Sequence, residues 1–574
     1  MVQSTPLLVG LRRKYSKART TLVAGSAFAE FSKRLPGIDE RVFFDLKQFK
    51  ESSPGPQASW VRVYRYLETF LEGLQRCRFD MVFNLSHSKL SALMIAYLGI
   101  PEVRGFRCNA SGERMTDHPW LQYFFTEPFN RSYNTFNLVD IFSRAGDLVP
   151  DSSGVSLTVY PEDEQKGETI LKAEGVAADE VLIGLQAGSS LEGRRWESSR
   201  FAQLADLLVE SMNARILLFG VASESRIARE IRQEMRRPDR ALDLTGRTDL
   251  GALIGLLSRC RYLVTNDTGT MHIAAALGVP IVGLFFAHAH PPETGPYAPG
   301  HLVFQANLPC APCSYGVECN HIVCVEQVDP AVVHKMMEKH FIDGQWTPPP
   351  FEPSLQGTLI YFTERDGDGC LRMRPLLRHP LSLTNVLAGA YRRLWLDTLT
   401  DPGARPSMAK VDEAAQTFRV DYDLTAARKM GAPLNAILRG IDTLHRLAEK
   451  GLNTLRSFIP NLETGGIRPE RLKGLAAEIS NLDEEITLIG FTRPELKPLA
   501  DMFNKRKENI DGEALRPMAQ ATQDCYFKLL QESRGLKEIL DHFSAELGLL
   551  AAVLGRGSRV SKRMDVAGRN NPAS

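Results

Sequence analysis

Hydrophobic and polar positions along the chain predict two regions with different periodicities. As far as about residue 345, short apolar runs alternate with segments whose apolar residues recur at helical spacing. The runs expected to form strands are 21–24, 42–45, 79–85, 181–185, 215–220, 262–264 and the run that begins at 279. Such alternation is typical of parallel sheets covered by helices. We therefore predict an α/β fold with two doubly wound domains, residues 1–160 and 161–345.

The second region, residues 408–554, has a helical pattern throughout. One apolar stripe runs from Leu434 to Leu455 and another from Leu536 to Leu550. Prolines divide the region into four or five predicted helices. These stripes are covered either within one bundle or by a second copy of the chain, which would make the extension an assembly surface. We expect this region to serve assembly, or delivery of a substrate to the α/β domains, rather than chemistry.

Three further segments complete the predicted organisation. A proline-rich break opens residues 346–407, which we expect to be a linker and a small irregular region. Residues 555–574 are basic and polar, which predicts a disordered tail, with contact to an anionic membrane surface as the alternative. Residues 107–150 are rich in aromatic side chains, and these form either a satellite core or an acceptor platform.

Candidate chemistry centres on the stretch from Val264 to Phe286. Asp267, Thr268 and Gly269 follow a predicted strand and precede a predicted helix, where backbone N–H groups favour a phosphate and glycine permits close approach. The stretch resembles the nucleotide-sugar motif of glycosyltransferase family 9, the lipopolysaccharide heptosyltransferases. Its signature, Asp-(Ser/Thr)-Gly-x-x-His, matches Asp267, Thr268, Gly269 and His272.

The resemblance covers about residues 1–345 and implies the GT-B architecture, in which two Rossmann-like domains face each other. It assigns phosphate-binding hydroxyls to Ser189 and Ser190, and it places Arg194 where the family has a phosphate-binding lysine. Glu224 matches an acid that binds the ribose, although a helix-capping role fits its position equally well. Thr245 and Gly246 match the loop beside the base.

The implied reaction is transfer of a sugar, heptose from an ADP-linked donor, to a lipopolysaccharide core or another glycan or protein acceptor, with inversion. Arg194 would stabilise the departing diphosphate. The family's general base is an Asp in an N-terminal Gly-Asp loop, and that position would precede Met1. We therefore expect in-frame codons upstream of Met1 to encode an apolar strand ending in Gly-Asp. The alternative is a catalytically inert nucleotide-sugar-binding scaffold.

Cys310, Cys313, Cys319 and Cys324 have spacing that suits a structural metal knuckle. Some family members that modify proteins hold iron in such a segment, and ligand type alone does not separate zinc from iron. The other interpretation is a set of reduced thiols that pack a loop. We expect no catalytic cofactor.

Composition narrows the class of partner. The formal charge of +1 over 574 residues gives no bias toward nucleic acid or membrane. No apolar run reaches the roughly 20 residues of a membrane span, and nine cysteines fit a reducing compartment. We expect a cytoplasmic protein with at most peripheral contact at the inner face of the inner membrane.

Overall fold

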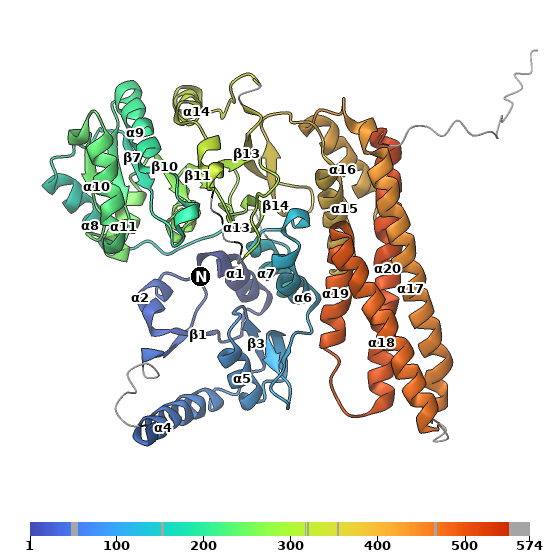
Figure 1. The fold of residues 1–574 in the computed structure, drawn as a ribbon. Helices are drawn as coiled ribbons and strands as arrows, with labels where there is room; N and C mark the ends of the chain where they lie inside the picture. The colour runs from blue at the N-terminus through green and yellow to red at the C-terminus, as the bar shows by residue number, and fades with distance from the viewer. Residues whose placement is uncertain are drawn as a thin grey trace, which may run out of the picture.

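The structure is a computed structural model that describes residues 1–47, 56–150, 154–315, 317, 319, 321–352, 355–463 and 468–549. Three parts are visible in Figure 1. An N-terminal α/β unit lies below a second α/β unit, and a bundle of long helices stands beside both. The basic tail predicted at 555–574 lies outside the described residues. None of the helices in the described ranges is both long and apolar enough to cross a membrane.

The N-terminal unit contains two separate pairs of parallel strands. β1 (Thr21–Gly25) pairs with β2 (Glu40–Phe44), and β3 (Met81–Asn84) pairs with β4 (Glu102–Gly105). The described residues do not join these pairs into one sheet. The accompanying helices are α1 (Thr5–Lys14), α2 (Ala29–Ser32), α4 (Pro56–Gln75) and α5 (Lys89–Leu98).

The second unit is built on an eight-stranded sheet in the order β14-β13-β12-β11-β10-β7-β8-β9. Its parallel strands are β7 (Leu182–Gln186), β8 (Arg215–Phe219), β9 (Ala241–Asp243), β10 (Tyr262–Asn266), β11 (Ile281–Phe285) and β12 (Leu302–Ala306). Most of their side chains are buried, because helices cover both faces. This confirms the doubly wound second domain.

Two layers of helices enclose that sheet. One face packs against α9 (Ser198–Met212), α10 (Ser225–Glu234) and α14 (Pro330–Asp343). The other face packs against α8 (Pro161–Ala173), α11 (Leu250–Leu257) and α12 (Gly269–Ala276). α13 (Pro291–Thr294) lies between β11 and β12 in the chain. The predicted alternation of strands and helices is therefore present in three dimensions.

The structure differs from the predicted linker at residues 346–407. β13 (Thr358–Arg365) and β14 (Leu371–Pro375) form an antiparallel hairpin that extends the sheet beyond β12, and α15 (Leu383–Thr398) follows. The sequence signal was a single apolar run at 359–362, and the polar residues of β14 concealed its partner. The sheet of the second unit therefore continues to Pro375.

The helical bundle comprises α15 with α16 (Met408–Asp421), α17 (Gly431–Glu463), α18 (Pro469–Thr492), α19 (Lys497–Glu508) and α20 (Leu515–Leu547). Both predicted stripes are buried within this chain, since residues from Leu434 to Leu455 and from Leu536 to Leu547 belong to one core cluster. They therefore offer no surface to a second copy. Pro460 was expected to divide helices, yet it lies inside α17, which continues to Glu463.

The aromatic region of residues 107–150 belongs to the same core as the bundle. α6 (Pro119–Thr126) and α7 (Leu138–Ala145) bury Trp120, Tyr123, Phe124 and Phe125 against apolar residues of the helical extension. Phe129, which follows α6, is exposed. This agrees with the core interpretation and leaves no aromatic platform from these four side chains.

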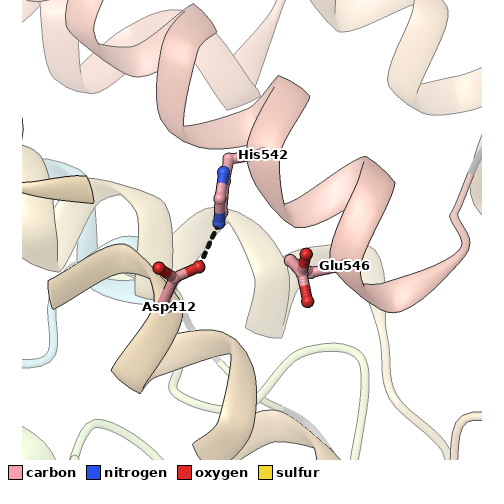
Figure 2. A group of neighbouring side chains, drawn as sticks. All are labelled: Asp412, His542 and Glu546. Atoms are coloured by element: carbon pink, nitrogen blue, oxygen red, sulfur yellow. Dashed lines mark hydrogen bonds and ion pairs between the residues drawn. The ribbon is translucent and has the colours of Figure 1, made fainter. Parts of the chain in front are cut away.

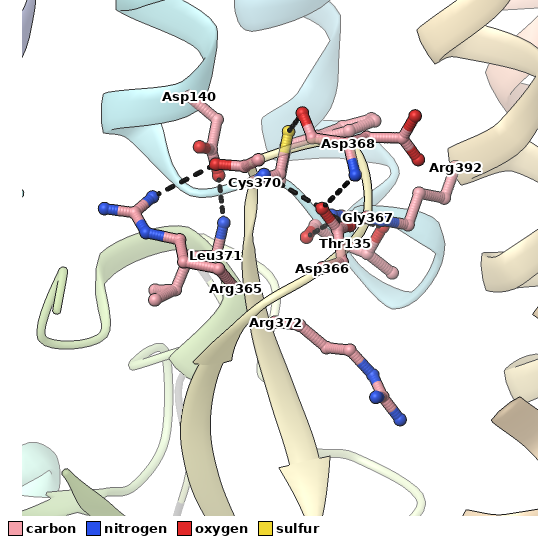
Figure 3. Close-up of polar contacts among 12 residues, drawn as sticks. Thr135, Asp140, Arg365, Asp366, Gly367, Asp368, Cys370, Leu371, Arg372 and Arg392 are labelled. Atoms are coloured by element: carbon pink, nitrogen blue, oxygen red, sulfur yellow. Dashed lines mark hydrogen bonds and ion pairs between the residues drawn. The ribbon is translucent and has the colours of Figure 1, made fainter. Parts of the chain in front are cut away.

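A buried polar junction joins the three parts at the β13–β14 turn (Figure 3). Asp140 of α7 accepts hydrogen bonds from the Tyr297 hydroxyl at 2.5 Å and from the backbone N–H of Leu371 at 3.1 Å. In the turn, Asp366 pairs with Arg392 of α15. Arg392 also donates to the Thr135 carbonyl at 2.8 Å. The turn thus contacts the N-terminal unit and the bundle simultaneously.

We expect the substitution D140N to make stability less dependent on pH. Burial raises the pKa of Asp140 to about 6, against about 3.9 in an unfolded chain. Between these values the folded carboxyl keeps a proton that the unfolded chain releases, so the wild-type protein loses stability as pH rises through this window. The melting temperature of D140N relative to wild type should therefore increase from pH 4 to pH 7. A difference that is constant with pH would contradict this assignment.

Candidate functional site

The predicted site residues gather at the carboxyl ends of β7, β8, β9 and β10. In an open parallel sheet these ends lie along one edge, where the loops that follow the strands form a crevice. The loop after β7 supplies Ser189, Ser190 and Arg194, and the loop after β10 supplies Asp267 and Thr268. The loops after β8 and β9 supply Glu224 and Thr245.

Hydrogen bonds within the chain fix the loop after β7. Arg195 donates to the Ser189 carbonyl from Nε at 2.9 Å and from Nη2 at 2.6 Å. Asn266 donates to the Ala187 carbonyl at 2.7 Å and accepts from the Trp196 backbone N–H at 3.2 Å. Trp196 is buried against Phe201, as predicted for a packing residue. Arg195 therefore supports the loop, and Arg194 is left to face the site.

Arg194 and Asp267 form the charged centre of the crevice. Arg194 Nη1 lies 3.6 Å from Asp267 Oδ2, and their side chains are only 17% and 10% exposed. Burial raises the pKa of Asp267 to about 6, although Arg194 and a 3.2 Å hydrogen bond from Thr294 oppose the shift. One guanidinium at this distance offsets the burial of the carboxylate only in part. The two residues thus form a loose pair that a ligand can enter.

The start of α12 faces the same place. Gly269 is its first residue, and Thr268 before it makes no side-chain cap, so the first N–H groups of the helix have no such partner. His272 lies one turn further on. Burial lowers its pKa to about 4, and the nearby amino group of Met1 adds to the shift. His272 is therefore neutral at physiological pH.

A small pocket lies beside the loop after β8. It is lined by Gly188, Glu224, Thr245 and apolar residues of β7, β8 and α10. A Cβ on Gly188 would lie 2.1 Å from the Glu224 carboxylate, so only glycine permits this approach. Glu224 Oε2 also accepts from the Val221 backbone N–H at 3.0 Å, which is the capping contact expected of it. Gly246 has a positive φ of 70° and holds the loop beside Thr245.

Several buried polar atoms in this crevice lack a hydrogen-bond partner among the described residues. They are Ser189 Oγ, Arg194 Nε, His272 Nδ1 and His288 Nδ1. Buried polar atoms are nearly always paired, and each exception calls for an explanation. Their position around Arg194 and Asp267 is that expected of groups that await a polar ligand.

A buried ion pair that the sequence did not reveal fixes this crevice to the N-terminal unit. Arg131 Nη2 lies 2.6 Å from Glu293 Oε2, with both side chains 5% exposed. Arg131 also donates to the carbonyls of His288, at 2.5 Å, and Cys313, at 2.8 Å. The pair joins positions 162 residues apart, so no local pattern could identify it. It holds the loop after β11 and the cysteine segment next to the site.

The cysteine segment lies against the same loop. All four thiols are free; Cys324 is buried, Cys313 is partly buried, and the other two are exposed. Burial raises the pKa of the Cys313 thiol, and the three neighbouring thiols contribute, which places all four near one another. No three of these sulfur atoms lie within 4.8 Å of one another in the described chain. The donors suit a thiophilic metal, while their spacing is wider than a bound ion requires.

Comparison with known proteins gives a consistent match. Residues 68–321 match the family model described as glycosyltransferase family 9 (heptosyltransferase). This segment is a glycosyltransferase family 9 domain. The matched segment contains the crevice residues from Ser189 to His272 and ends before Cys324.

Related proteins carry heptosyltransferase names. Lipooligosaccharide heptosyltransferase 2 of Haemophilus influenzae is 30% identical over 37% of this chain and 61% of its own length. Lipopolysaccharide heptosyltransferase 2 of Escherichia coli is 26% identical over 50% of this chain and 79% of its own. The first alignment thus spans less than two thirds of that relative.

Solved structures of such proteins also align with the chain. Escherichia coli ADP-heptose lps heptosyltransferase II gives a TM-score of 0.44 at 19% identity, over 60% of this chain and 96% of that one. A glycosyl transferase family 9 protein from Veillonella parvula gives 0.49 at 21% identity, over 60% and 94%.

Breaking the Arg131–Glu293 pair should destabilise the folded protein strongly. R131M leaves a buried carboxylate without its counter-ion, which costs about 3–5 kcal/mol. The double variant R131M/E293L removes both charges and should recover part of this loss. The two carbonyls that Arg131 contacts remain unpaired, so recovery should be incomplete. Denaturant unfolding gives the free energy of unfolding of the wild type and both variants. An R131M variant as stable as wild type would show that the ion pair does not stabilise the fold.

Proposed function

We propose that this protein transfers a sugar, heptose from an ADP-linked donor, to a lipopolysaccharide core or another glycan or protein acceptor, with inversion. The observation that carries the proposal is the meeting of Ser189 and Arg194 with Asp267 and the start of α12 in one crevice. The family 9 match over these residues and the names of the relatives support the choice of sugar.

The donor would bind across the strand ends. Its diphosphate would accept hydrogen bonds from Ser189, Ser190, Arg194 and the first N–H groups of α12. Its ribose would contact Glu224, and its base would lie beside the loop of Thr245 and Gly246. Asp267 and His272 lie where hydroxyl groups of the sugar would meet polar partners.

The reaction is a direct displacement at the anomeric carbon. The acceptor oxygen forms a bond to that carbon as the bond to the diphosphate breaks, and the acceptor hydroxyl gives up its proton to a base. Arg194 supports this step because it stabilises the negative charge that develops on the diphosphate. We assign no base within the chain. His87 packs among Phe106, Phe124 and Phe125, and we do not assign it as the base.

A nucleotide-sugar-binding scaffold without activity is the second candidate function. Incubation of the full chain with ADP-heptose and a heptose-free lipopolysaccharide acceptor decides between the two. We expect release of ADP and a product of inverted configuration by NMR. If the protein binds the donor but releases no ADP with any of several acceptors, the result would support the scaffold function instead. The assay on a cytoplasmic extract and on membranes would also locate the activity, which we propose to be cytoplasmic.

The substitution R194A should weaken binding of ADP more than binding of adenosine. A charge-assisted hydrogen bond contributes about 1.5–3 kcal/mol, so its loss should raise the Kd for ADP by roughly 10- to 100-fold. Isothermal calorimetry with both ligands measures the two effects. The control is R226A, which removes an exposed arginine of α10 that pairs with Glu230. Equal weakening of ADP and adenosine by R194A would exclude Arg194 from the diphosphate.

We also propose that the four cysteines hold one structural zinc or iron ion. Four neighbouring thiols are the donor set that such ions prefer, and binding would draw the sulfur atoms closer than in the present structure. Elemental analysis of protein purified without chelator should give about one metal per chain. C310S/C313S should lose it, whereas C77S, at an exposed cysteine outside the segment, should retain it. If the wild-type protein contains no metal and added metal does not change its thermal stability, the cysteines are reduced thiols that pack the loop.

A further inference from the structure

Three side chains from two helices of the bundle form a second cluster of metal-binding groups, far along the chain from the cysteines. His542 and Glu546 occupy the last turns of α20, and Asp412 lies in α16 (Figure 2). One nitrogen or oxygen atom from each of the three lies within 4.8 Å of the others. It is the one such group of histidine, cysteine or carboxylate residues found in the described chain.

Helix geometry and packing bring these side chains together. Positions four apart lie on the same face of a helix, so His542 and Glu546 point the same way. Phe418 of α16 contacts Phe543 of α20 at a centroid distance of 5.4 Å, and both are buried beside the cluster. The ligand atoms are therefore carried by two rigid helices whose relative position is set by a packed core.

We propose that Asp412, His542 and Glu546 bind a divalent first-row transition ion, zinc in particular, that bridges α16 and α20. An imidazole with two carboxylates selects such an ion over calcium or magnesium, which take oxygen ligands alone. A tetrahedral zinc ion with bonds of about 2.1 Å holds its ligands roughly 3.4 Å apart. His542 Nε2 and Asp412 Oδ1 are 2.5 Å apart, so small side-chain rotations reach that spacing.

The surroundings determine what kind of site this is. The Asp412 and Glu546 side chains are 57% and 39% exposed, which leaves the fourth position open to water. Arg419 donates to Glu546 Oε2 at 2.7 Å and to the Glu546 carbonyl at 2.6 Å. It competes for the carboxylate and also holds it beside His542, as partners of metal ligands do. We therefore infer an exchangeable zinc site that stabilises the end of the bundle.

Zinc titration of the full chain tests the proposal. Protein stripped with a chelator is titrated with Zn²⁺ in wild-type, H542Q, D412N and E546Q forms. The matched control is D524N, because Asp524 is exposed on the same helix several turns from the cluster. Each cluster variant should bind one zinc ion at least about tenfold more weakly. D524N should bind as wild type does. Micromolar Zn²⁺ should raise the melting temperature of wild type and leave that of H542Q unchanged.

Cobalt separates this site from the cysteines. Co²⁺ on thiolates absorbs strongly in the near ultraviolet through charge transfer from sulfur, whereas Co²⁺ on imidazole and carboxylate does not. H542Q should therefore lose one bound ion without loss of that absorption. His542 and Asp412 are partly or largely exposed, so each variant should melt as wild type does in the absence of metal. The same number of zinc ions bound with the same affinity by wild type, H542Q and D412N would overturn the proposal.

Discussion

Buried charge must be paired, and this constraint determines how the three parts of the molecule fit together. Arg131 of the N-terminal unit meets Glu293 of the second unit, and Arg392 of α15 meets Asp366 of the β13–β14 turn. Each pair joins two different parts. A shift of either part would separate a buried cation from its carboxylate at a cost of several kcal/mol. Buried ion pairs, as well as apolar contacts, therefore hold the bundle and both α/β units in one arrangement.

The helical extension shares its core with the N-terminal unit. Apolar residues of α6 and α7 share one core with α15, α17 and α20. Polar contacts continue the interface: Asn509 accepts from the Thr116 backbone N–H at 2.6 Å, and Asn130 donates to Asp501 at 3.0 Å. The helical extension is therefore joined to the N-terminal unit by both apolar and polar contacts.

The sequence predicted most of what depends on local pattern. The strands β7, β8, β10 and β11 appeared as apolar runs because helices cover both faces of the sheet, whereas the three-residue strand β9 was not predicted. Motifs in the loops after β7 and β10 could be aligned with those of the family. It did not predict β14, whose Arg372 and Arg374 pair with Glu364 across the hairpin and so hide the apolar alternation of a strand. Nor could it predict Arg131 beside Glu293, since chain topology alone brings these two residues together.

In the proposed donor complex, Arg194 would contact the diphosphate and Asp267 would contact the sugar. With a pKa of about 6, Asp267 is mostly ionised at pH 7, and Arg194 at 3.6 Å is the main group that favours its charge. A diphosphate that draws Arg194 toward itself weakens that support. Hydroxyl groups of an attached sugar can replace it by donating to the carboxylate, whereas a nucleotide without sugar cannot. On the proposed function, a complete donor would therefore bind more tightly than its nucleotide product, and Asp267 would be more readily protonated while that product is bound.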